Sequence, residues 1–446
     1  MARRDARLRL GAFLSGSGAH AGSWRHPQAD ADASINFERY RQYAQTLERG
    51  RFDALFLNDN VAVGDLDPRV LRSSAYSLRW DPLTLLPALA VVTRHIGLIA
   101  TANTSFNEPY NIARKFASLD HLSGGRAGWN LVTALIGGEN FNQPGHLPHA
   151  DRYARAEEFF DVVTGLWDSW ADDAFVLDKV SGTWLKPERM RVLDHQGEHF
   201  RVRGPLNAPR PVQGWPVIAQ AGSSPAGRAL AARSAELVFT AQQSLEEGRA
   251  FYDDIHQRLA NAGRAPTALK VFPGLAPVVG RTASEAQEKH EQLQALVDPE
   301  AALKALSFLL DIGIDLERLA PDAPVVLPDP LPVTERHKSR QQLVVDLIRR
   351  ERPTAGQLLR KLGAGGHRLM VGTPQQIVDE MATWFEEGAA DGFNLLFTHL
   401  PGGLDDFVEW VIPELQRVGL FRREYEGRTL RENLGLDAVQ NRHFAG

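Results

Sequence analysis

The sequence predicts an α/β protein, a closed (β/α)8 TIM barrel with insertions after the fourth and seventh strands and a C-terminal extension. Short apolar or β-branched runs alternate with longer segments of helical periodicity, which is typical of βα units around a parallel sheet. The runs number eight, which favours a closed barrel over an open doubly wound sheet. The chain has 446 residues, so the length beyond the ~250 residues of a bare barrel must lie in insertions.

The eight predicted strands are distributed along the whole chain. In order they are 8–14, 53–59, 96–102, 125–134, 216–222, 235–241, 269–280 and 393–399. The predicted helices between and around them are 36–50, 81–93, 109–122, 151–170, 225–234, 244–263 and 373–390. Two of these helices open on strong start signals, Asp81-Pro82 and Thr373-Pro374, because an N-cap side chain followed by proline favours the first turn.

Three segments account for the surplus length of a chain that we expect to form a single barrel domain over residues 1–446. Residues 172–214 include EHFRVRGPLN, which indicates a hairpin-like cover. Residues from about 284 to 370 form a polar helical stretch with a proline-rich run. Residues 419–446 form a polar tail, which we expect to wrap a neighbouring subunit.

The composition excludes several classes of protein. Hydrophobic residues make up 43%, charged residues 24%, and the net charge is −5, so neither nucleic-acid binding nor a basic membrane patch is indicated. The absence of cysteine excludes disulfides, thiolate nucleophiles and cysteine-ligated metals. No secretory signal and no run of ~18 apolar residues is present, which predicts a cytoplasmic protein without a membrane span.

Polar residues gather at the predicted strand ends, where the chemistry of such barrels takes place. They are mainly amides and hydroxyls, which suit a flat, heteroatom-rich ligand better than a metal, and no metal site is predicted. The residues are Asn58, Asp59, Asn60, Asn103, Thr104, Ser105, Asn130, Thr133, Gln220, Ser223, Ser224, Thr240, Gln242, Thr398 and His399.

The segment SLDHLSGGRAGWNLVTA, residues 118–134, places polar groups inside an apparently buried strand. An unpaired buried amide costs about 1 to 3 kcal/mol, so Asn130 is either a ligand contact or is satisfied by Thr133 or the adjacent backbone. Both interpretations stay open. Trp129 is more typical of a core or wall residue than of a cofactor platform. The two glycines favour a tight turn into the strand.

The segment GSSPAGR, residues 222–228, follows a strand and opens a helix at Pro225. Its amides and the hydroxyls of Ser223 and Ser224 could hold a phosphate at the helix start. An ordinary N-cap is the simpler interpretation. The segment matches neither a Walker loop nor GxGxxG.

The segment HLPHADRYARAEEF, residues 146–159, contains His146 and His149, but no partner follows at zinc-ligand spacing. His149 and Tyr153 are four residues apart at a helix start, so they could share one face and reach a phosphate or a reacting oxygen. A surface histidine is the simpler alternative.

Five segments together resemble the bacterial-luciferase-like flavin monooxygenases, in the two-component branch of nitrilotriacetate, dibenzothiophene-sulfone and long-chain alkane monooxygenases. They span most of the chain in the family's order. The segments are 56–59 (FLND), 105–133, 149–159, 200–242 and 419–436.

The resemblance implies a luciferase-like barrel that binds FMN as FMNH2, supplied by a separate NAD(P)H:FMN reductase. Such an enzyme activates O2 as an oxygenated flavin and inserts one oxygen atom into a small organic substrate. The implied catalytic residues are Asn130, His149 and Tyr153. The implied cofactor-binding residues are Asp59, Asn103, Thr104, Asn130, Thr133, His149, Tyr153, Ser223, Ser224 and Arg228.

The chain departs from the family pattern after the third strand. Where relatives often read Thr-Ala-Ser-Thr, residues 101–104 read Thr-Ala-Asn-Thr, so Asn103 places an amide where a small hydroxyl is usual. Residues 60–80 correspond to a variable loop that is expected to shape the substrate pocket.

Two alternatives stay open beside the monooxygenase interpretation. One is a deazaflavin-dependent oxidoreductase on the same barrel, and the other is a non-catalytic flavin-binding protein. The resemblance also suggests a homodimer or homotetramer. It leaves the substrate open, because family members attack C–N bonds, C–S bonds and unactivated alkyl carbons with similar flavin residues.

Overall fold

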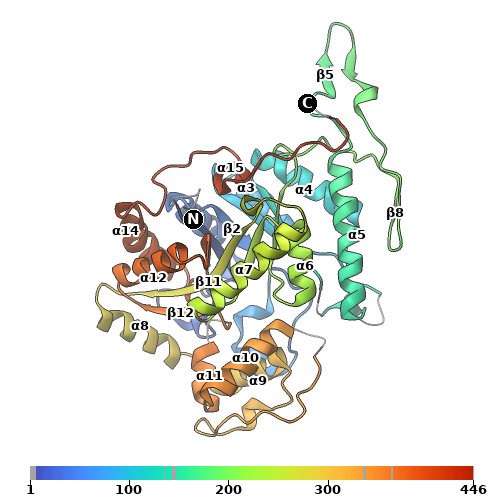
Figure 1. The fold of residues 1–446 in the computed structure, drawn as a ribbon. Coiled ribbons are helices and arrows are strands. Elements are labelled where there is room, and N and C mark those ends of the chain that lie inside the picture. The colour runs from blue at the N-terminus through green and yellow to red at the C-terminus, as the bar shows by residue number, and fades with distance from the viewer. Residues whose placement is uncertain (1–6, 135, 143–146, 335–337, 363–364, 445–446) are drawn as a thin grey trace.

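The computed structural model describes residues 7–134, 136–142, 147–334, 338–362 and 365–444, and its centre is a closed parallel barrel (Figure 1). Eight strands pair in the order β1-β2-β3-β4-β9-β10-β11-β13, and β13 pairs back to β1. They are β1 (Arg9–Leu14), β2 (Ala54–Leu57), β3 (Gly97–Asn103), β4 (Ala127–Val132), β9 (Val217–Gln220), β10 (Leu237–Thr240), β11 (Lys270–Val279) and β13 (Gly392–Leu395). The predicted barrel and its eight strands are confirmed.

A further strand, β12 (Arg368–Gly372), extends the sheet beyond the barrel, and the sequence analysis did not predict it. It pairs with the second half of β11, with Leu275 opposite Arg368. Its first four residues are only partly buried, so the segment lacks the continuous apolar character of the barrel strands.

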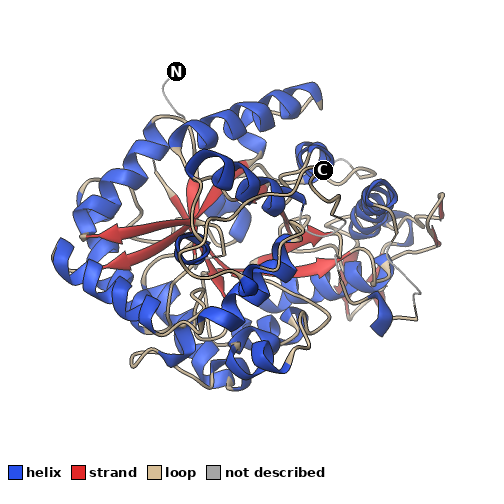
Figure 2. Cartoon of the chain, turned by 90° about the horizontal axis from the view of Figure 1, so that it is seen from below, coloured by secondary structure: helices blue, strands red, loops and turns tan. Residues whose placement is uncertain are grey.

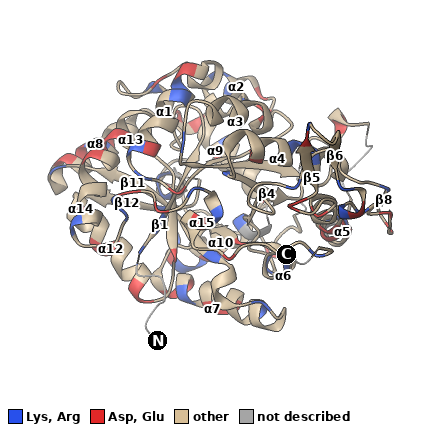
Figure 3. Ribbon diagram, turned by 90° about the horizontal axis from the view of Figure 1, so that it is seen from above, with Lys and Arg blue, Asp and Glu red and all other residues tan. Residues whose placement is uncertain are grey.

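The barrel helices surround the strands, as Figure 2 shows. They are α1 (Phe37–Arg49), α3 (Pro82–Ala90), α4 (Pro109–Ser123), α5 (His149–Trp167), α6 (Pro225–Ser234), α7 (Leu245–Asn261), α12 (Pro374–Glu386), α13 (Gly402–Asp406) and α14 (Ile412–Arg417). The predicted start signals are confirmed, because Asp81 accepts a hydrogen bond from the Thr84 amide and Thr373 forms a capping box with Gln376. Figure 3 shows charged residues of both signs spread over these helices.

Trp129 belongs to the packed layer between the sheet and the helices, as the simpler interpretation predicted. The indole is fully buried among Phe116, Phe159 and Trp167, and its Nε1 donates to the carbonyl of Ala102 at 3.0 Å. Since side chains alternate along a strand, the next residue of β4, Asn130, faces the barrel interior.

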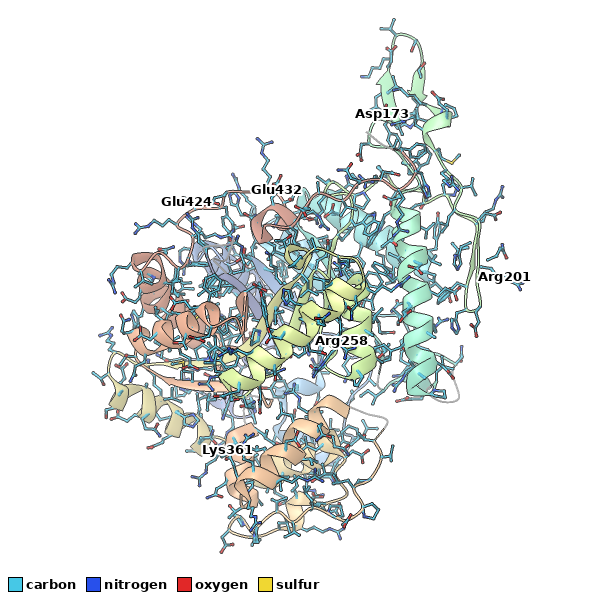
Figure 4. The ribbon with its side chains drawn as sticks, viewed as in Figure 1. Asp173, Arg201, Arg258, Lys361, Glu424 and Glu432 are labelled. Atoms are coloured by element: carbon cyan, nitrogen blue, oxygen red, sulfur yellow. The ribbon has the colours of Figure 1, made fainter. Side chains whose placement is uncertain are left out.

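The insertion after β4 forms two antiparallel hairpins that project from the barrel (Figure 1). The strands are β5 (Phe175–Asp178), β6 (Thr183–Leu185), β7 (His195–Gln196) and β8 (Arg201–Val202). Asp173 and Arg201, labelled in Figure 4, mark these projecting segments. The predicted hairpin-like cover between residues 172 and 214 is therefore present as two hairpins.

The insertion between β11 and β12 is helical and has a small core of its own. Its helices are α8 (Ala283–Ala295), α9 (Pro299–Leu310), α10 (Lys338–Glu351) and α11 (Ala355–Leu362). Apolar side chains of α9, α10 and α11 pack together, among them Leu303, Val344 and Leu358. The short helix α2 (Pro68–Ser73), from the variable loop, contacts α9.

The C-terminal tail covers the amino-terminal end of its own barrel, and its contact with a neighbouring subunit stays a prediction. Its helix α15 (Leu430–Leu434) inserts Leu430 beside Gly97 and Gly128, where the strands begin. Arg422 pairs with the buried carboxylate of Asp53. In Figure 4, Glu432 in α15 lies on the upper side of the barrel and Lys361 in α11 lies below the barrel. The opposite end of the barrel, which we call the mouth, therefore faces the helical insertion.

Candidate active site

The interior below the mouth is lined by three phenyl rings from different strands. Phe13, Phe56 and Phe239 contact one another with ring centroids 5.4 to 6.0 Å apart. Phe56 and Phe239 are nearly fully buried. We call these three rings the apolar floor. They offer a ligand no hydrogen bond, so its polar contacts must come from the polar residues at the strand ends.

Asn130 is held by one hydrogen bond and keeps one acceptor unused. Its Nδ2 donates to the hydroxyl of Thr101 on β3 at 2.9 Å. Its Oδ1 is buried and has no partner among the described residues, and the residue is only 4% exposed. The interpretation as a self-satisfied strand residue is thus half correct, with Thr101 as the partner instead of Thr133. An unpaired buried acceptor costs about 1 to 3 kcal/mol, so the Oδ1 of Asn130 is a candidate contact for a ligand that can donate a hydrogen bond.

Asn103 and Thr104 shape the chain at the end of β3. The Oδ1 of Asn103 accepts the Phe106 amide at 2.8 Å, and the amide and hydroxyl of Thr104 both donate to the carbonyl of Val132, at 2.9 and 3.4 Å. Both residues are almost fully buried. The amide in place of the usual small hydroxyl therefore has a local role in the turn that follows the strand.

The loop after β9 is a tight turn lined by backbone. Ser224 is the N-cap of α6, with its hydroxyl oxygen accepting the Gly227 amide at 3.1 Å, so the N-cap interpretation is confirmed. A side chain at Gly222 would lie 2.9 Å from the Cα of Gly227, so the loop and the first helical turn touch through glycine alone. A helix start exposed in this way suits an anion, because its first amides have no partner inside the helix.

Arg228 lies beneath this loop and is fixed on three sides. Its Nε donates to the carbonyl of Ser223 at 2.9 Å, its Nη1 pairs with Asp254 at 2.9 Å, and its guanidinium lies 5.0 Å from the Phe251 ring centre. The residue therefore stabilises the loop and places a positive charge next to it.

Asp59 stands at the end of β2 beside a second acidic group. Burial raises its pKa to about 6, and the nearby carboxylate of Asp81 adds to that rise. A small polar cavity opens at the adjoining strand ends, lined by Ser15, Asn58 and Arg79 among others. A carboxyl group with this pKa exchanges a proton near neutral pH, as acid–base residues require.

The helix α5 carries the two remaining predicted contacts. Tyr153 is partly buried and packs against the main core. The side chain of His149 lies outside the described residues, and so does His146. Thr133 is partly buried just beyond β4. Within the part of the chain that the structure describes, no group of histidines and carboxylates could hold a metal ion.

Three buried polar residues on the other side of the mouth were not predicted from the sequence. Asn394 of β13 is 1% exposed, and neither its Oδ1 nor its Nδ2 has a partner among the described residues. His367, just before β12, is almost fully buried, and burial lowers its pKa well below the ordinary value. Arg340 in α10 approaches it. The signal for Asn394 was present, because it is an amide inside the apolar run FNLLF, as Asn130 is inside its own.

Comparisons with known proteins agree with this geometry. Residues 16–391 match the family model described as luciferase-like monooxygenase. The chain is 48% identical to nitrilotriacetate monooxygenase component A of Aminobacter aminovorans, over 98% of each protein. It is 42% identical to dibenzothiophene-sulfone monooxygenase of Rhodococcus erythropolis, over 96% of each. The crystal structure of long-chain alkane monooxygenase superposes with a TM-score of 0.84 at 34% identity, covering 98% of this chain and 96% of that one.

The predicted resemblance is thereby confirmed, down to the branch with these three relatives. Relatives at this identity over nearly the full chain are monooxygenases, which favours oxygenation over the deazaflavin and non-catalytic alternatives. A reduced flavin is the cofactor of the family. None of the helices in the described ranges is long and apolar enough to cross a membrane. The chain is an enzyme of the luciferase-like monooxygenase family.

Proposed function

We propose that the protein is an FMNH2-dependent monooxygenase that receives reduced FMN from a separate NAD(P)H-dependent flavin reductase and inserts one oxygen atom of O2 into a small organic substrate. The observation that carries this proposal is the unpartnered Oδ1 of Asn130 above an apolar floor, beside a helix-start loop. A ligand with a planar ring that donates a hydrogen bond, and with a phosphate at the end of a chain, would match these three features.

The residues present fit FMN. The strands β4 and β9 are neighbours, with Asn130 in register with Ala219, so the loop at residues 222–228 follows the strand next to Asn130. A ring at Asn130 and a phosphate at Ser223 and Ser224 would therefore be held by adjacent strands. The acceptor of Asn130 matches a ring N–H, and the hydroxyls and amides of the loop match phosphate oxygens.

Bound reduced FMN supplies the reaction with O2, and the protein supplies position and exclusion of water. Asn130 and Thr133 orient the edge of the ring, and Asp59, Asn103 and Thr104 line it. Ser223 and Ser224 hold the phosphate, and Arg228 supports their loop.

His149 and Tyr153 belong to the first turns of α5, and the family resemblance implies that both would lie near the phosphate and ribityl chain. Either side chain can donate a proton to a reacting oxygen. The proton on Asp59, whose pKa burial raises to about 6, is a further source near neutral pH.

The partners follow from the same proposal. One relative is named as component A of a monooxygenase, which supports a second component in that system, and we infer a reductase partner here. We further propose a cytoplasmic location and a homodimer or homotetramer.

The proposal is tested by anaerobic titration of the protein with photoreduced FMN and, separately, with oxidised FMN and riboflavin. We expect reduced FMN to bind, and Asn130→Ala to weaken that binding while Asn207→Ala, at an exposed asparagine in the insertion after β4, leaves it unchanged. Full turnover of a substrate with NADH and FMN in the absence of any reductase would overturn the two-component proposal.

A further inference from the structure

The barrel wall opposite the proposed flavin site carries buried polar groups that the proposed function does not use. In the strand order, β13 and β1 lie across the barrel from β4 and β9. Asn394 of β13 is in register with Gly11 of β1 on one side and with Gly274 of β11 on the other. Two glycines therefore flank the inward-facing amide, and neither places a side chain beside it.

The side chain of Asn394 occupies the space that a side chain at Gly11 would take. A Cβ at Gly11 would lie 2.9 Å from the Oδ1 of Asn394. Both amide atoms are buried and without partners among the described residues. An apolar residue such as leucine would fit this run without leaving polar atoms unpaired. The presence of an amide that bonds to none of the described residues therefore points to a ligand.

His367 occupies the space that a side chain at Gly274 would take. A Cβ at Gly274 would lie 2.2 Å from the Nδ1 of His367, and the ring stacks on Phe239 with centroids 4.9 Å apart and planes 9° apart. Its Nε2 lies 3.4 Å from the Nη2 of Arg340. Because a guanidinium only donates, Nε2 is the acceptor and the neutral ring carries its proton on Nδ1. That N–H is buried with no partner in the described chain.

Arg340 adds a cation to this wall. Its Nη1 is buried without a hydrogen-bond partner among the described residues, and burial is the one influence that shifts its pKa, with no contribution from a described carboxylate. Burial lowers its pKa to about 10, so it stays charged at neutral pH. A buried guanidinium is unfavourable when no anion offsets its charge, and none of the described carboxylates does so here, which makes an anion of the substrate a stabilising partner for Arg340.

We propose that Arg340, His367 and Asn394 form a subsite for a carboxylate of the substrate, and that the enzyme therefore oxidises an organic acid. The Nη1–H of Arg340 and the Nδ1–H of His367 offer two donors to a planar anion with two oxygens, and the Nδ2 of Asn394 offers a third. This subsite rests on the proposed function for its role, because it would anchor the acid on the wall facing the flavin.

The same donors could in principle take the phosphate of FMN, and the two sources are separable. The phosphate proposed at Ser223 and Ser224 lies after β9, whereas the Arg340 subsite adjoins β11 and β13. A carboxylate subsite affects binding of acids without affecting the preference of the protein for FMN over riboflavin.

The test is calorimetric titration of the flavin-free protein with nitrilotriacetate, succinate and tricarballylate, and with the methyl esters of these acids as neutral controls. We expect at least one acid to bind and its ester to bind far more weakly. Arg340→Met should weaken acid binding by about 10- to 100-fold. Arg349→Met, an exposed arginine on the same helix, should not change it.

The variant Arg340→Lys and the binding of FMN separate the possible outcomes. Arg340→Lys keeps the charge and should bind the acid more tightly than Arg340→Met does, so a folding defect is distinguishable from loss of the cation. Equal binding of acid and ester, no binding of any acid, or loss of the FMN-over-riboflavin preference in Arg340→Met would overturn the subsite. Failure of reduced FMN to bind would overturn the proposed function and leave acid binding intact.

Discussion

The two ends of the barrel both bury polar side chains but treat them differently. At the closed end, Asp53 accepts the Leu10 amide at 2.7 Å and pairs with Arg422, whose Nη1 also donates to Asn433 at 3.1 Å. At the mouth, Asn394 and the Oδ1 of Asn130 are equally buried and have no partners among the described residues. Polar groups at the closed end hold the fold together, whereas those at the mouth are kept for a ligand.

The largest effect is expected at the closed end. Arg422→Met leaves the buried Asp53 carboxylate with only its longer contact to Arg9, 3.9 Å away, which should lower the free energy of unfolding by up to about 3 kcal/mol. Urea unfolding measures the change. The neighbouring Arg423→Met is the control, since Arg423 is exposed and should matter by less than about 0.5 kcal/mol. Equal stability of the two variants would show that the closed end is not held by this pair.

A cluster of buried histidines at the rim of the mouth predicts a pH effect of nearly the same size. Burial, with the neighbouring histidines, lowers the pKa of His20 to about 4 and that of His399 to about 3. The groups around them are His26, His290, Gln294, Lys289 and Asp406.

The sign follows from the two states. Below the unfolded pKa of about 6.5, the unfolded chain binds protons that the folded protein refuses, so stability falls as pH drops toward 4, by up to about 1.4 kcal/mol per pH unit for each histidine. Above pH 6.5 these groups contribute no pH dependence. Unfolding followed from pH 7 to 4.5 should show a shallower slope in His20→Gln and an unchanged slope in the exposed control His95→Gln. An identical slope in all three proteins would contradict the assignment.

The loop after β9 should combine a small loss of stability with a specific loss of affinity. Ser224→Ala removes the N-cap of α6 and should cost about 1 kcal/mol. It should also weaken FMN binding and leave riboflavin binding unchanged. Ser244→Ala removes the N-cap of α7, where Ser244 accepts the Glu247 amide at 3.2 Å, and so matches the stability loss without touching the site. If both variants bind FMN equally well, the phosphate lies elsewhere.

The smallest effect on stability, and the sharpest contrast with the closed end, is expected at Asn394. Asn394→Leu replaces two unsatisfied polar atoms by apolar ones of similar volume, which should leave stability unchanged or raise it by about 1 kcal/mol. Thermal unfolding measures this, and acid binding should fall in the same variant. A loss of several kcal/mol would mean that Asn394 is structural after all.

The barrel could be predicted from the sequence because each of its eight strands is recognisable from its own short segment. The buried strands are short apolar runs separated by helices, and several of these helices have their own start signal, as at Asp81 and Ser224. The strand β12 escaped because it is half-buried and sits at the end of a polar insertion. The covering of the closed end by Leu430 could not be read from its own segment, since it depends on Gly97 and Gly128 far earlier in the chain.

The site was predicted in part for the same reason. Asn130 and Ser224 were found because an amide in an apolar run and a serine before a helix are local patterns. The partner of Asn130 is Thr101, across a strand pair, which no local pattern reveals. The folding of a long insertion brings His367 against Gly274, the register partner of Asn394, and Arg340 against His367, so the wall across from the proposed flavin site could not be predicted from local patterns.

One measurement tests the central claim that the mouth holds reduced FMN for reaction with O2. The protein is loaded anaerobically with photoreduced FMN and mixed rapidly with oxygenated buffer while absorbance is followed near ~370 to 390 nm. The account predicts a band that far outlives the reoxidation of free reduced FMN and decays faster when a suitable acid is present. Reoxidation as fast as that of free FMN would contradict the account.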